Sequence, residues 1–306
     1  MASVEMSNGK ELRLPDFIHV GPPRTGTSWL HEVLAGHVSL PSEKETRFFD
    51  LHYARGLDWY CNLFGDYPAD GPAGEFCPGY FSNAVARERI KLHIPDCRIL
   101  VTFREPASRL YSMYRLFYSR HLPVNDTFDA YWRLQIVSGA DLCSYATNLR
   151  RWQAEFGKSR VLVLFYEDLS SNPQGYLDTV CDFIGAGRIE LDRSGVGSAK
   201  VHSAPATARS SVLARRVVEA VDWASRHGGA RLIELGRHTK LWKIMRQPFV
   251  ADFPPLSHEL ADELRAMMLP ETDELERMTG RDLSHWKPRA QRKFDDGRSN
   301  VRLQAG

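Results

Sequence analysis

The stretch Phe17-Ile-His-Val-Gly-Pro-Pro-Arg-Thr-Gly-Thr-Ser-Trp29 decides the fold of this chain. An apolar run that favours a strand breaks at Gly-Pro-Pro, and a loop that contains glycine leads directly into a helical pattern. In such a layout the backbone N–H groups of the loop and the positive end of the helix converge on an anion. The sequence therefore predicts a phosphate-binding loop between a buried strand and a helix.

This loop differs from the Walker A loop of nucleoside triphosphatases, which reads G-x-x-x-x-G-K-[ST]. Gly21 and Gly26 keep the spacing of the two glycines, but Thr27 takes the place of the lysine. The cation of the loop is Arg24, two residues before the second glycine. The pattern indicates a loop that binds a phosphate ester without the usual triphosphate and magnesium machinery.

Three short apolar runs predict the strands of a central sheet: Phe17–Gly21, Arg98–Phe103 and Arg160–Phe165. Their nearly continuous Val, Ile, Leu and Phe content is typical of strands buried on both faces. Helical patterns separate the runs, so we expect an α/β fold in which a P-loop-like parallel sheet has helices on both faces. The expected helices are 28–36, 83–93, 106–120, 127–137, 144–156, 173–184, 211–227 and 257–279.

Length and composition bound the domain organisation and the partners. The 306 residues carry a net charge of +2 and are 43% hydrophobic, which is ordinary for a globular protein. Such a small net charge favours neither nucleic acid nor a membrane surface as partner, and no apolar run approaches the ~18 residues of a membrane span. We expect a single domain with a short polar extension over 1–14 and a frayed polar tail over 288–306. The sequence makes no prediction of oligomeric state.

The five cysteines are scattered and lack C-x-x-C spacing. This usage is typical of reduced, structural thiols and gives no indication of a zinc site. The N-terminal segment is polar and has no apolar core, so we expect no secretory signal. The predicted location is cytoplasmic.

A second candidate anion site follows the middle strand, in the segment Arg104-Glu-Pro-Ala-Ser-Arg-Leu-Tyr-Ser112. Ligands of open α/β sheets gather beyond the carboxyl ends of the strands, where a P-loop nucleotidase needs an acidic metal ligand. This strand ends instead at Arg104, whose guanidinium suits bidentate binding of a phosphate. A surface ion pair with Glu105 is the alternative. Two phosphate sites without a metal acid indicate a nucleotide that is phosphorylated at two places.

These motifs resemble those of the sulfotransferases that use 3′-phosphoadenosine 5′-phosphosulfate (PAPS). The segment Pro23–Leu30 is similar to the family's 5′-phosphosulfate loop, and Arg104…Ser112 is similar to its 3′-phosphate motif R-[DE]-P-x-x-R-x-x-S. Further similarities to heparan sulfate and related carbohydrate sulfotransferases lie at 45–60, 75–81 and 161–173. The resemblance implies metal-independent transfer of the sulfuryl group from PAPS to a small-molecule or glycan acceptor.

The resemblance assigns the 5′ side of the donor to six consecutive loop residues: Arg24, Thr25, Gly26, Thr27, Ser28 and Trp29. Arg24 replaces the family's loop lysine; it cannot lose a proton, so its catalytic role is to stabilise developing charge. Arg104 and Ser112 are implied ligands of the 3′-phosphate. The segment 185–210 fits the family's donor-closing loop, in which Lys200 and then Arg209 are the expected cations, with a solvated basic loop as the alternative.

Glu45, in Glu45-Thr-Arg-Phe-Phe-Asp50, matches the family's catalytic base, which takes the proton of the acceptor. A solvated loop acid is the alternative, because Glu43 and Lys44 adjoin it. His93 is a rival base, since Lys91-Leu-His-Ile-Pro95 is similar to the K-x-H-x-P context of cytosolic sulfotransferases. We favour Glu45 and interpret His93 as a residue near a helix C-terminus.

Phe76 and Tyr80 are the expected acceptor-site residues, although such aromatic side chains also fit a core. Phe76 replaces the lysine of the family's E-K-[ST]-P motif, and loss of that cation argues against a highly sulfated acceptor. The expected acceptor is a hydroxyl, less so an amine, of a sugar, glycolipid or secondary metabolite.

Two other functions are compatible with the same fold. A magnesium-dependent small-molecule kinase with an atypical P-loop is disfavoured by Thr27 and Arg104 in the positions of the lysine and the metal acid. A noncatalytic nucleotide-binding protein is disfavoured by the joint presence of Arg24, Glu45, Arg104 and Ser112.

Overall fold

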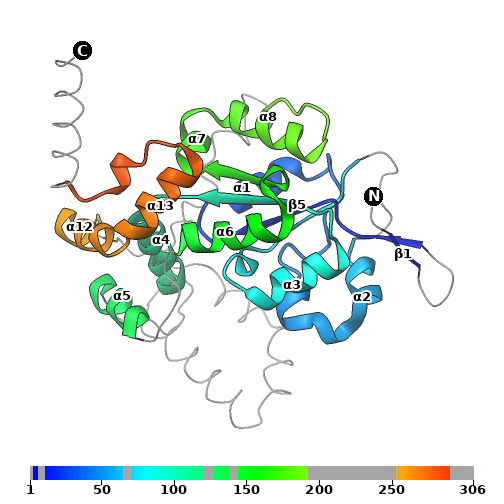
Figure 1. Cartoon of the computed structure of the whole chain (residues 1–306), viewed down its shortest axis with the longest axis horizontal. Helices are drawn as coiled ribbons and strands as arrows, with labels where there is room; N and C mark the ends of the chain where they lie inside the picture. The colour runs from blue at the N-terminus through cyan, green and yellow to red at the C-terminus, as the bar shows by residue number, and fades with distance from the viewer. Residues whose placement is uncertain are drawn as a thin grey trace, which may run out of the picture. The chain divides into compact units, whose positions relative to one another are not determined.

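Four parallel strands form the central sheet in the order β4 (Gly74–Phe76), β3 (Phe17–Gly21), β5 (Arg98–Phe103) and β6 (Val161–Phe165). The pairing sets Ile18 beside Ile99, and Ile99 beside Val161. The three strands predicted from apolar runs are confirmed, with a difference of one residue at the start of β6 (Figure 1).

The fourth strand, β4, was not predicted. It has only three residues, and its middle residue is a glutamate, so it lacks the apolar run that marks the other strands. Gly74 pairs with Phe17, and a Cβ on Gly74 would lie 2.0 Å from the Phe17 ring. Only glycine lets that ring lie against the edge strand.

The computed structural model describes residues 3–5, 11–64, 71–119, 127–137, 144–191, 253 and 255–289. The chain divides into a first unit, comprising Met1–Pro106, Cys143–Val201 and Asp262–Gly306, and a second unit, comprising Ala107–Leu142 and His202–Ala261. The single domain predicted from the sequence stays a prediction beside this division. The expected helix 211–227 and the cations Lys200 and Arg209 lie outside the described residues.

Helices cover both faces of the sheet in the first unit (Figure 1). On one face Phe17, Leu100 and Leu164 form a buried cluster with α1 (Thr27–Leu34), α7 (Tyr166–Ser171) and α8 (Pro173–Ile184). The other face packs against α6 (Tyr145–Phe156), where the Phe103 ring lies 4.7 Å from the Tyr145 ring, with α3 (Ala84–His93) beside α6. Because strand side chains alternate, the near-continuous apolar runs are explained by these two buried faces. The predicted α/β fold is confirmed.

The helix ends follow local chemistry. The side chain of Asn83 accepts a hydrogen bond from the backbone N–H of Ala86 and caps α3, and Asn172 caps α8 in the same way ahead of Pro173. The helix expected at 257–279 is divided at Met268 into α12 (His258–Met267) and α13 (Leu269–Thr279). Pro270, in the first turn of α13, cannot donate the backbone hydrogen bond that a continuous helix needs.

The remaining elements are short. Within the predicted polar extension, β1 (Ser3–Glu5) and β2 (Glu11–Arg13) pair as an antiparallel ribbon. The segment between α1 and β4 contains a π-helix, η1 (Phe48–His52), the 3₁₀ turn η2 (Tyr53–Arg55) and α2 (Gly56–Asn62). The other 3₁₀ turns are η3 (Pro78–Tyr80), η4 (Lys158–Arg160) and η5 (Ser284–Trp286).

The second unit contains most of α4 (Pro106–Ser119) and the whole of α5 (Phe128–Val137). Tyr114 is the centre of an aromatic cluster there, with the rings of Phe128, Tyr131 and Phe253 within 6.0 Å of it. Ser112 lies on α4 within this unit.

The described residues can be compared with the expectations about thiols, metal sites and membrane spans. Cys61, Cys77, Cys97 and Cys181 are buried free thiols. Among the described residues, no group of three or more His, Cys, Asp or Glu residues is arranged to hold a metal ion. The helices that the structure describes are each too short or too polar to cross a membrane.

Candidate functional site

The loop after β3 closes tightly on its own backbone and on η3. Gly21 has a φ of 107°, and a Cβ at this position would lie 2.5 Å from the carbonyl oxygen of Pro78. The Thr25 hydroxyl donates to the carbonyl oxygen of Pro22 at 2.8 Å, so this side chain holds the loop closed. The positive φ of 93° at Gly26 then turns the chain into α1.

The N-terminus of α1 is left open for an anion. No side chain caps Gly26, and no acidic residue lies in the first turn. The first intrahelical bond runs from Leu30 N to Gly26 O at 3.2 Å, so the N–H groups of Thr27, Ser28 and Trp29 belong to the unsatisfied start of the helix. The Trp29 side chain packs in the core beside Tyr176, which leaves only its N–H for the loop. This is the geometry of a phosphate site.

The two arginines predicted from separate motifs come together. Arg104, directly after β5, donates from Nη1 to the carbonyl oxygen of Arg24 at 3.2 Å. Its guanidinium lies 4.4 Å from the centre of the Tyr166 ring, and the Tyr145 hydroxyl donates to its carbonyl oxygen at 3.0 Å. Arg24 itself has a φ of 72°, in the left-handed region that costs a non-glycine residue about 1–2 kcal/mol. Such strain is concentrated at functional sites.

Lys44 is a further cation beside the loop, and it was not predicted from the sequence. Its Nζ donates to the Ser28 hydroxyl in the first turn of α1. Burial, and then the positive charge of Lys44, lower the pKa of the nearby His31. The available signal was the position of this lysine directly before Glu45, but the local sequence does not show that its side chain reaches the loop.

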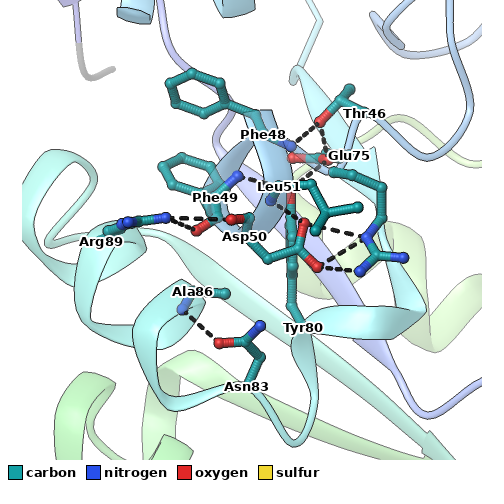
Figure 2. A network of polar contacts seen from close by, with 11 residues as sticks. Thr46, Phe48, Phe49, Asp50, Leu51, Glu75, Tyr80, Asn83, Ala86 and Arg89 are labelled. Atoms are coloured by element: carbon teal, nitrogen blue, oxygen red, sulfur yellow. Dashed lines mark hydrogen bonds and ion pairs between the residues drawn. The ribbon is translucent and has the colours of Figure 1, made fainter. Parts of the chain in front are cut away.

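Glu45 is exposed and adjoins the residue that reaches the loop. Within the part of the chain that the structure describes, no hydrogen bond or ion pair involves its carboxylate. We define the segment Glu45–Asp50 as the base turn, and Figure 2 shows the polar contacts of the residues that follow Glu45 in it. Arg47, at a φ of 52°, pairs with Asp50, and Arg89 of α3 donates to the carbonyl oxygen of Phe49 at 2.8 Å.

Glu75 of β4 lies fully buried beneath the base turn. Its carboxylate accepts hydrogen bonds from the hydroxyls of Thr46 and Tyr80, which Figure 2 shows, and from the hydroxyl of Tyr60. Burial raises the pKa of Glu75 to about 7, against the lowering effect of these hydrogen bonds. Glu75 was not predicted as a site residue, because a single glutamate in a three-residue strand gives no sign that its side chain is buried.

A second buried network lies beneath the donor loop. The backbone N–H of Gly21 donates to His19 Nδ1 at 3.2 Å, and His19 Nε2 lies 2.9 Å from the Thr102 hydroxyl. The Tyr176 hydroxyl of α8 lies 2.8 Å from the same Thr102 oxygen. Burial lowers the pKa of His19 to about 3, so this histidine is neutral.

The structure puts the two expected acceptor residues in the core. Phe76 is fully buried, with its ring stacked on His19 at 5.5 Å, and Tyr80 is fully buried between Glu75 and Phe49. Neither side chain presents surface to an acceptor in this conformation. The inference of acceptor charge from Phe76 therefore loses its basis.

His93, the rival base, ends α3 only five residues before β5 begins. It therefore lies toward the amino-terminal end of that strand, whereas the donor loop follows the carboxyl end of β3. The Tyr53 hydroxyl lies 2.6 Å from its Nε2, and burial lowers the pKa of His93. The structure thus brings Arg24, Arg104 and the α1 terminus together and leaves His93 apart from them.

This chain is similar in sequence to known sulfotransferases. The family model of the sulfotransferase domain matches residues 14–194. Bifunctional heparan sulfate N-deacetylase/N-sulfotransferase 1 of Mus musculus is 31% identical over 196 residues, which cover 56% of this chain and 22% of that protein. Bifunctional heparan sulfate N-deacetylase/N-sulfotransferase 2 of Homo sapiens is 27% identical over 196 residues, with the same coverage of both chains. The chain thus spans 22% of the length of these curated relatives.

The fold itself has a counterpart among solved structures. The crystal structure of a sulfotransferase from Alicyclobacillus acidocaldarius aligns with a TM-score of 0.64 at 20% identity. The alignment covers 90% of this chain and 99% of that chain. At this level of identity the likeness concerns the fold alone.

Proposed function

The chain belongs to the sulfotransferase family, and we propose that it transfers the sulfuryl group of PAPS to an acceptor by in-line displacement. The observation that carries the proposal is the hydrogen bond from Arg104 Nη1 to the Arg24 carbonyl oxygen at 3.2 Å. It joins the strand-end guanidinium to the loop at the start of α1. The loop and the guanidinium match the two anionic ends of a donor that is phosphorylated at its 5′ and 3′ positions.

The donor's 5′-phosphosulfate binds the open N–H groups at the start of α1 and the Arg24 guanidinium. Gly26 allows the turn, Thr25 keeps the loop closed, and the hydroxyls of Thr27 and Ser28 lie in the first helical turn. Arg104 binds the 3′-phosphate. Ser112, Lys200 and Arg209 keep their roles as 3′-side ligands on the strength of the resemblance alone.

Lys44 supplies a second positive charge at the sulfuryl end. Sulfuryl transfer resembles loose phosphoryl transfer, in which catalysis consists mostly of positioning and charge stabilisation. Negative charge grows on the bridging oxygen as the S–O bond breaks, and a fixed cation beside it stabilises the transition state. The Lys44 ammonium, bound to Ser28 in the first turn of α1, is suited to this role.

Glu45 acts as the general base. A hydroxyl or amino acceptor must lose a proton as its oxygen or nitrogen bonds to sulfur, and a carboxylate at hydrogen-bond distance can take it. Glu45 is exposed and directly follows Lys44, so a proton acceptor and a cation for the leaving group come from adjacent residues.

The proposed acceptor is a sugar, a glycolipid or a secondary metabolite with a hydroxyl or amino group. The curated relatives are named for N-sulfation of heparan sulfate, which supports a carbohydrate and favours the amine more than the sequence motifs do. We propose that no metal ion takes part. Glu105, the acid next to Arg104, is buried and paired with Arg265 at 3.1 Å.

Titration calorimetry with adenosine 3′,5′-bisphosphate, AMP and ATP, each in EDTA, tests the donor site. We expect the 3′,5′-bisphosphate to bind at least about tenfold more tightly than AMP, because only the former engages Arg104. Labelled PAPS with de-N-sulfated heparan sulfate, a neutral oligosaccharide and a phenol then screens the acceptor class. Magnesium-dependent phosphoryl transfer from ATP, or equal affinity for AMP and the bisphosphate, would reject the proposal.

A further inference from the structure

The base turn is connected to the buried Glu75 carboxylate through two hydroxyl groups. Thr46 Oγ1 donates to Glu75 Oε1 and accepts from the backbone N–H of Phe48 at 3.1 Å. Tyr80 OH donates to the same oxygen at 3.1 Å and accepts from the backbone N–H of Phe49 at 3.1 Å. Both contacts are visible in Figure 2. One carboxylate oxygen therefore orients two hydroxyls, and each hydroxyl holds one N–H of the turn.

The third hydroxyl is different. Tyr60, on α2, donates to Glu75 Oε2 at 2.7 Å, and its ring stacks on Phe48. Its oxygen is bound to the other side of the carboxylate and does not receive an N–H from the base turn among the described contacts. The chain thus provides two tyrosines with the same buried carboxylate as partner, of which one relays to the turn and the other does not.

The surroundings of Glu75 make this link stiff. It is fully buried, and the charged or titratable groups around it are Tyr60, Tyr80, Cys77, Cys97 and Asp50, the last paired with Arg47. A buried hydroxyl without its acceptor loses a hydrogen bond that water cannot replace. The orientations of Thr46 and Tyr80 are therefore strongly determined by Glu75.

We propose that Glu75 is a positioning residue for the general base Glu45, acting through the Thr46 and Tyr80 hydroxyls on the backbone of the base turn. The inference rests on the proposed function, because it assigns Glu75 a role in the reaction of Glu45. The Glu45 carboxylate has no hydrogen bond or ion pair among the described residues, so the space that it can reach is set by the backbone position of Glu45, which directly precedes the buried and hydrogen-bonded Thr46. Misplacement of a catalytic group by about 1 Å can cost about 100-fold in rate.

The first test replaces Glu75 with an apolar and with a polar side chain of similar length. Glu75→Met removes both acceptor oxygens, and we expect kcat to fall about 30-fold or more while the dissociation constant of adenosine 3′,5′-bisphosphate stays within about twofold. Glu75→Gln keeps an oxygen at the Oε1 position and donates from its amide nitrogen to Tyr60. It should therefore hold kcat within about threefold of the native enzyme. Equal losses in both variants would overturn the proposal.

The second test uses the two tyrosines as a matched pair, and it remains informative if Glu75→Met does not fold. Each substitution removes one buried hydroxyl from Glu75. Tyr80→Phe should lower kcat about tenfold or more and accelerate amide hydrogen exchange at Phe49, whereas Tyr60→Phe should change kcat less than about threefold. A larger effect of Tyr60→Phe, or unchanged exchange at Phe49 in Tyr80→Phe, contradicts the relay.

Failure of this inference can be separated from failure of the proposed function. The exchange measurement needs no acceptor, and bisphosphate binding needs no turnover. If the native protein binds the bisphosphate and transfers sulfuryl groups, but Glu75→Met has native kcat, only the positioning role is wrong. If the native protein transfers no sulfuryl group, the proposed function fails, while exchange at Phe48 and Phe49 still decides whether Glu75 holds the turn.

Discussion

Two buried polar networks lie side by side beneath the candidate site, and they differ in chemistry and in what they hold. The first network joins His19, Thr102 and Tyr176 and binds the backbone N–H of Gly21 in the donor loop. The second joins Glu75 to Thr46 and Tyr80 beneath the base turn. His19 and the residue after Glu75 are partners in the β3–β4 register. Adjacent strands thus support the binding half and the proton-transfer half of the proposed site separately.

The difference between the networks predicts different kinetic signatures. The histidine network fixes main chain at a glycine, so it shapes the anion site and acts on donor affinity. The glutamate network fixes hydroxyls that hold the turn of the general base, so it acts on turnover. A change that lowers affinity without turnover, or turnover without affinity, identifies the half of the site to which a residue belongs.

The largest effect is expected at Arg104. Arg104→Ala removes the charge-assisted contacts to the 3′-phosphate and should weaken binding of adenosine 3′,5′-bisphosphate by about 2–4 kcal/mol, or about 30- to 1,000-fold. Arg98→Ala is the matched control, because Arg98 starts the same strand and donates to the carbonyl oxygen of Ile184 at the other end. Calorimetry that finds Arg104→Ala within twofold of the native affinity would show the assignment to be wrong.

On the other side of the comparison, Glu45→Gln should lower kcat by about 100-fold or more and leave bisphosphate affinity unchanged. The amide keeps the size of the side chain but cannot take a proton. Glu43→Gln, an exposed acid two residues earlier, serves as control and should retain native turnover. Activity in Glu45→Gln together with an inactive His93→Ala would transfer the role of base to His93.

Much of the donor-binding half of the site could be predicted from the sequence. The strand that ends in Gly21 and the arginine that directly follows β5 are local signals. The parallel topology brings the carboxyl ends of these two strands to one edge of the sheet. In the proton-transfer half Glu45 was predicted, but the contacts around it could not be. Lys44 reaches the loop from a segment 16 residues beyond Ser28, and Glu75 is buried by the packing of three separate segments. No periodicity encodes such contacts.

The burial of Phe76 and Tyr80, which were expected at the acceptor site, was not evident from the sequence for the same physical reason. An aromatic residue near a functional motif has the same local sequence whether it lines a cleft or fills the core. Phe76 belongs to the three-residue strand β4, whose inward direction becomes evident only when it pairs with β3. A sequence pattern therefore indicates charged functional residues more directly than it indicates the apolar residues that contact a ligand.

A smaller effect is expected from the shape of the donor loop. Gly21→Ala puts a Cβ 2.5 Å from a backbone oxygen of Pro78 at a φ of 107°, and should lower the free energy of unfolding by about 2–4 kcal/mol. Gly280→Ala is the matched control: Gly280 has a φ of 67° and a ψ of 10°, in the left-handed region, and nothing lies within 4 Å of the added Cβ. We expect it to cost only about 1 kcal/mol in chemical denaturation. Equal costs would show that the contact with η3 does not constrain the loop.

The smallest net effect concerns the response of stability to pH, because the two networks oppose each other. Burial lowers the pKa of His19 from 6.5 to about 3, so the unfolded chain binds the extra proton in that range and stability rises with pH. Burial raises the pKa of Glu75 from 4.5 to about 7, so the folded chain binds the extra proton and stability falls as pH rises. Between pH 4.5 and 6.5 the two contributions cancel in the native protein.

Removing one titrating group leaves the pH dependence that the other group contributes to stability without its opposing effect. In Glu75→Gln the free energy of unfolding should rise between pH 4.5 and 6.5 more steeply than in the native protein, by up to about 1.4 kcal/mol per pH unit. In His19→Gln it should fall with pH relative to the native protein, by up to about the same amount. Urea denaturation at several pH values measures both slopes, and differences from the native protein cancel the titration of His31 and His93. Parallel slopes in the two variants would mean that the two networks do not contribute opposite pH dependences to stability, and the contrast between the two halves of the site would then lie in geometry alone.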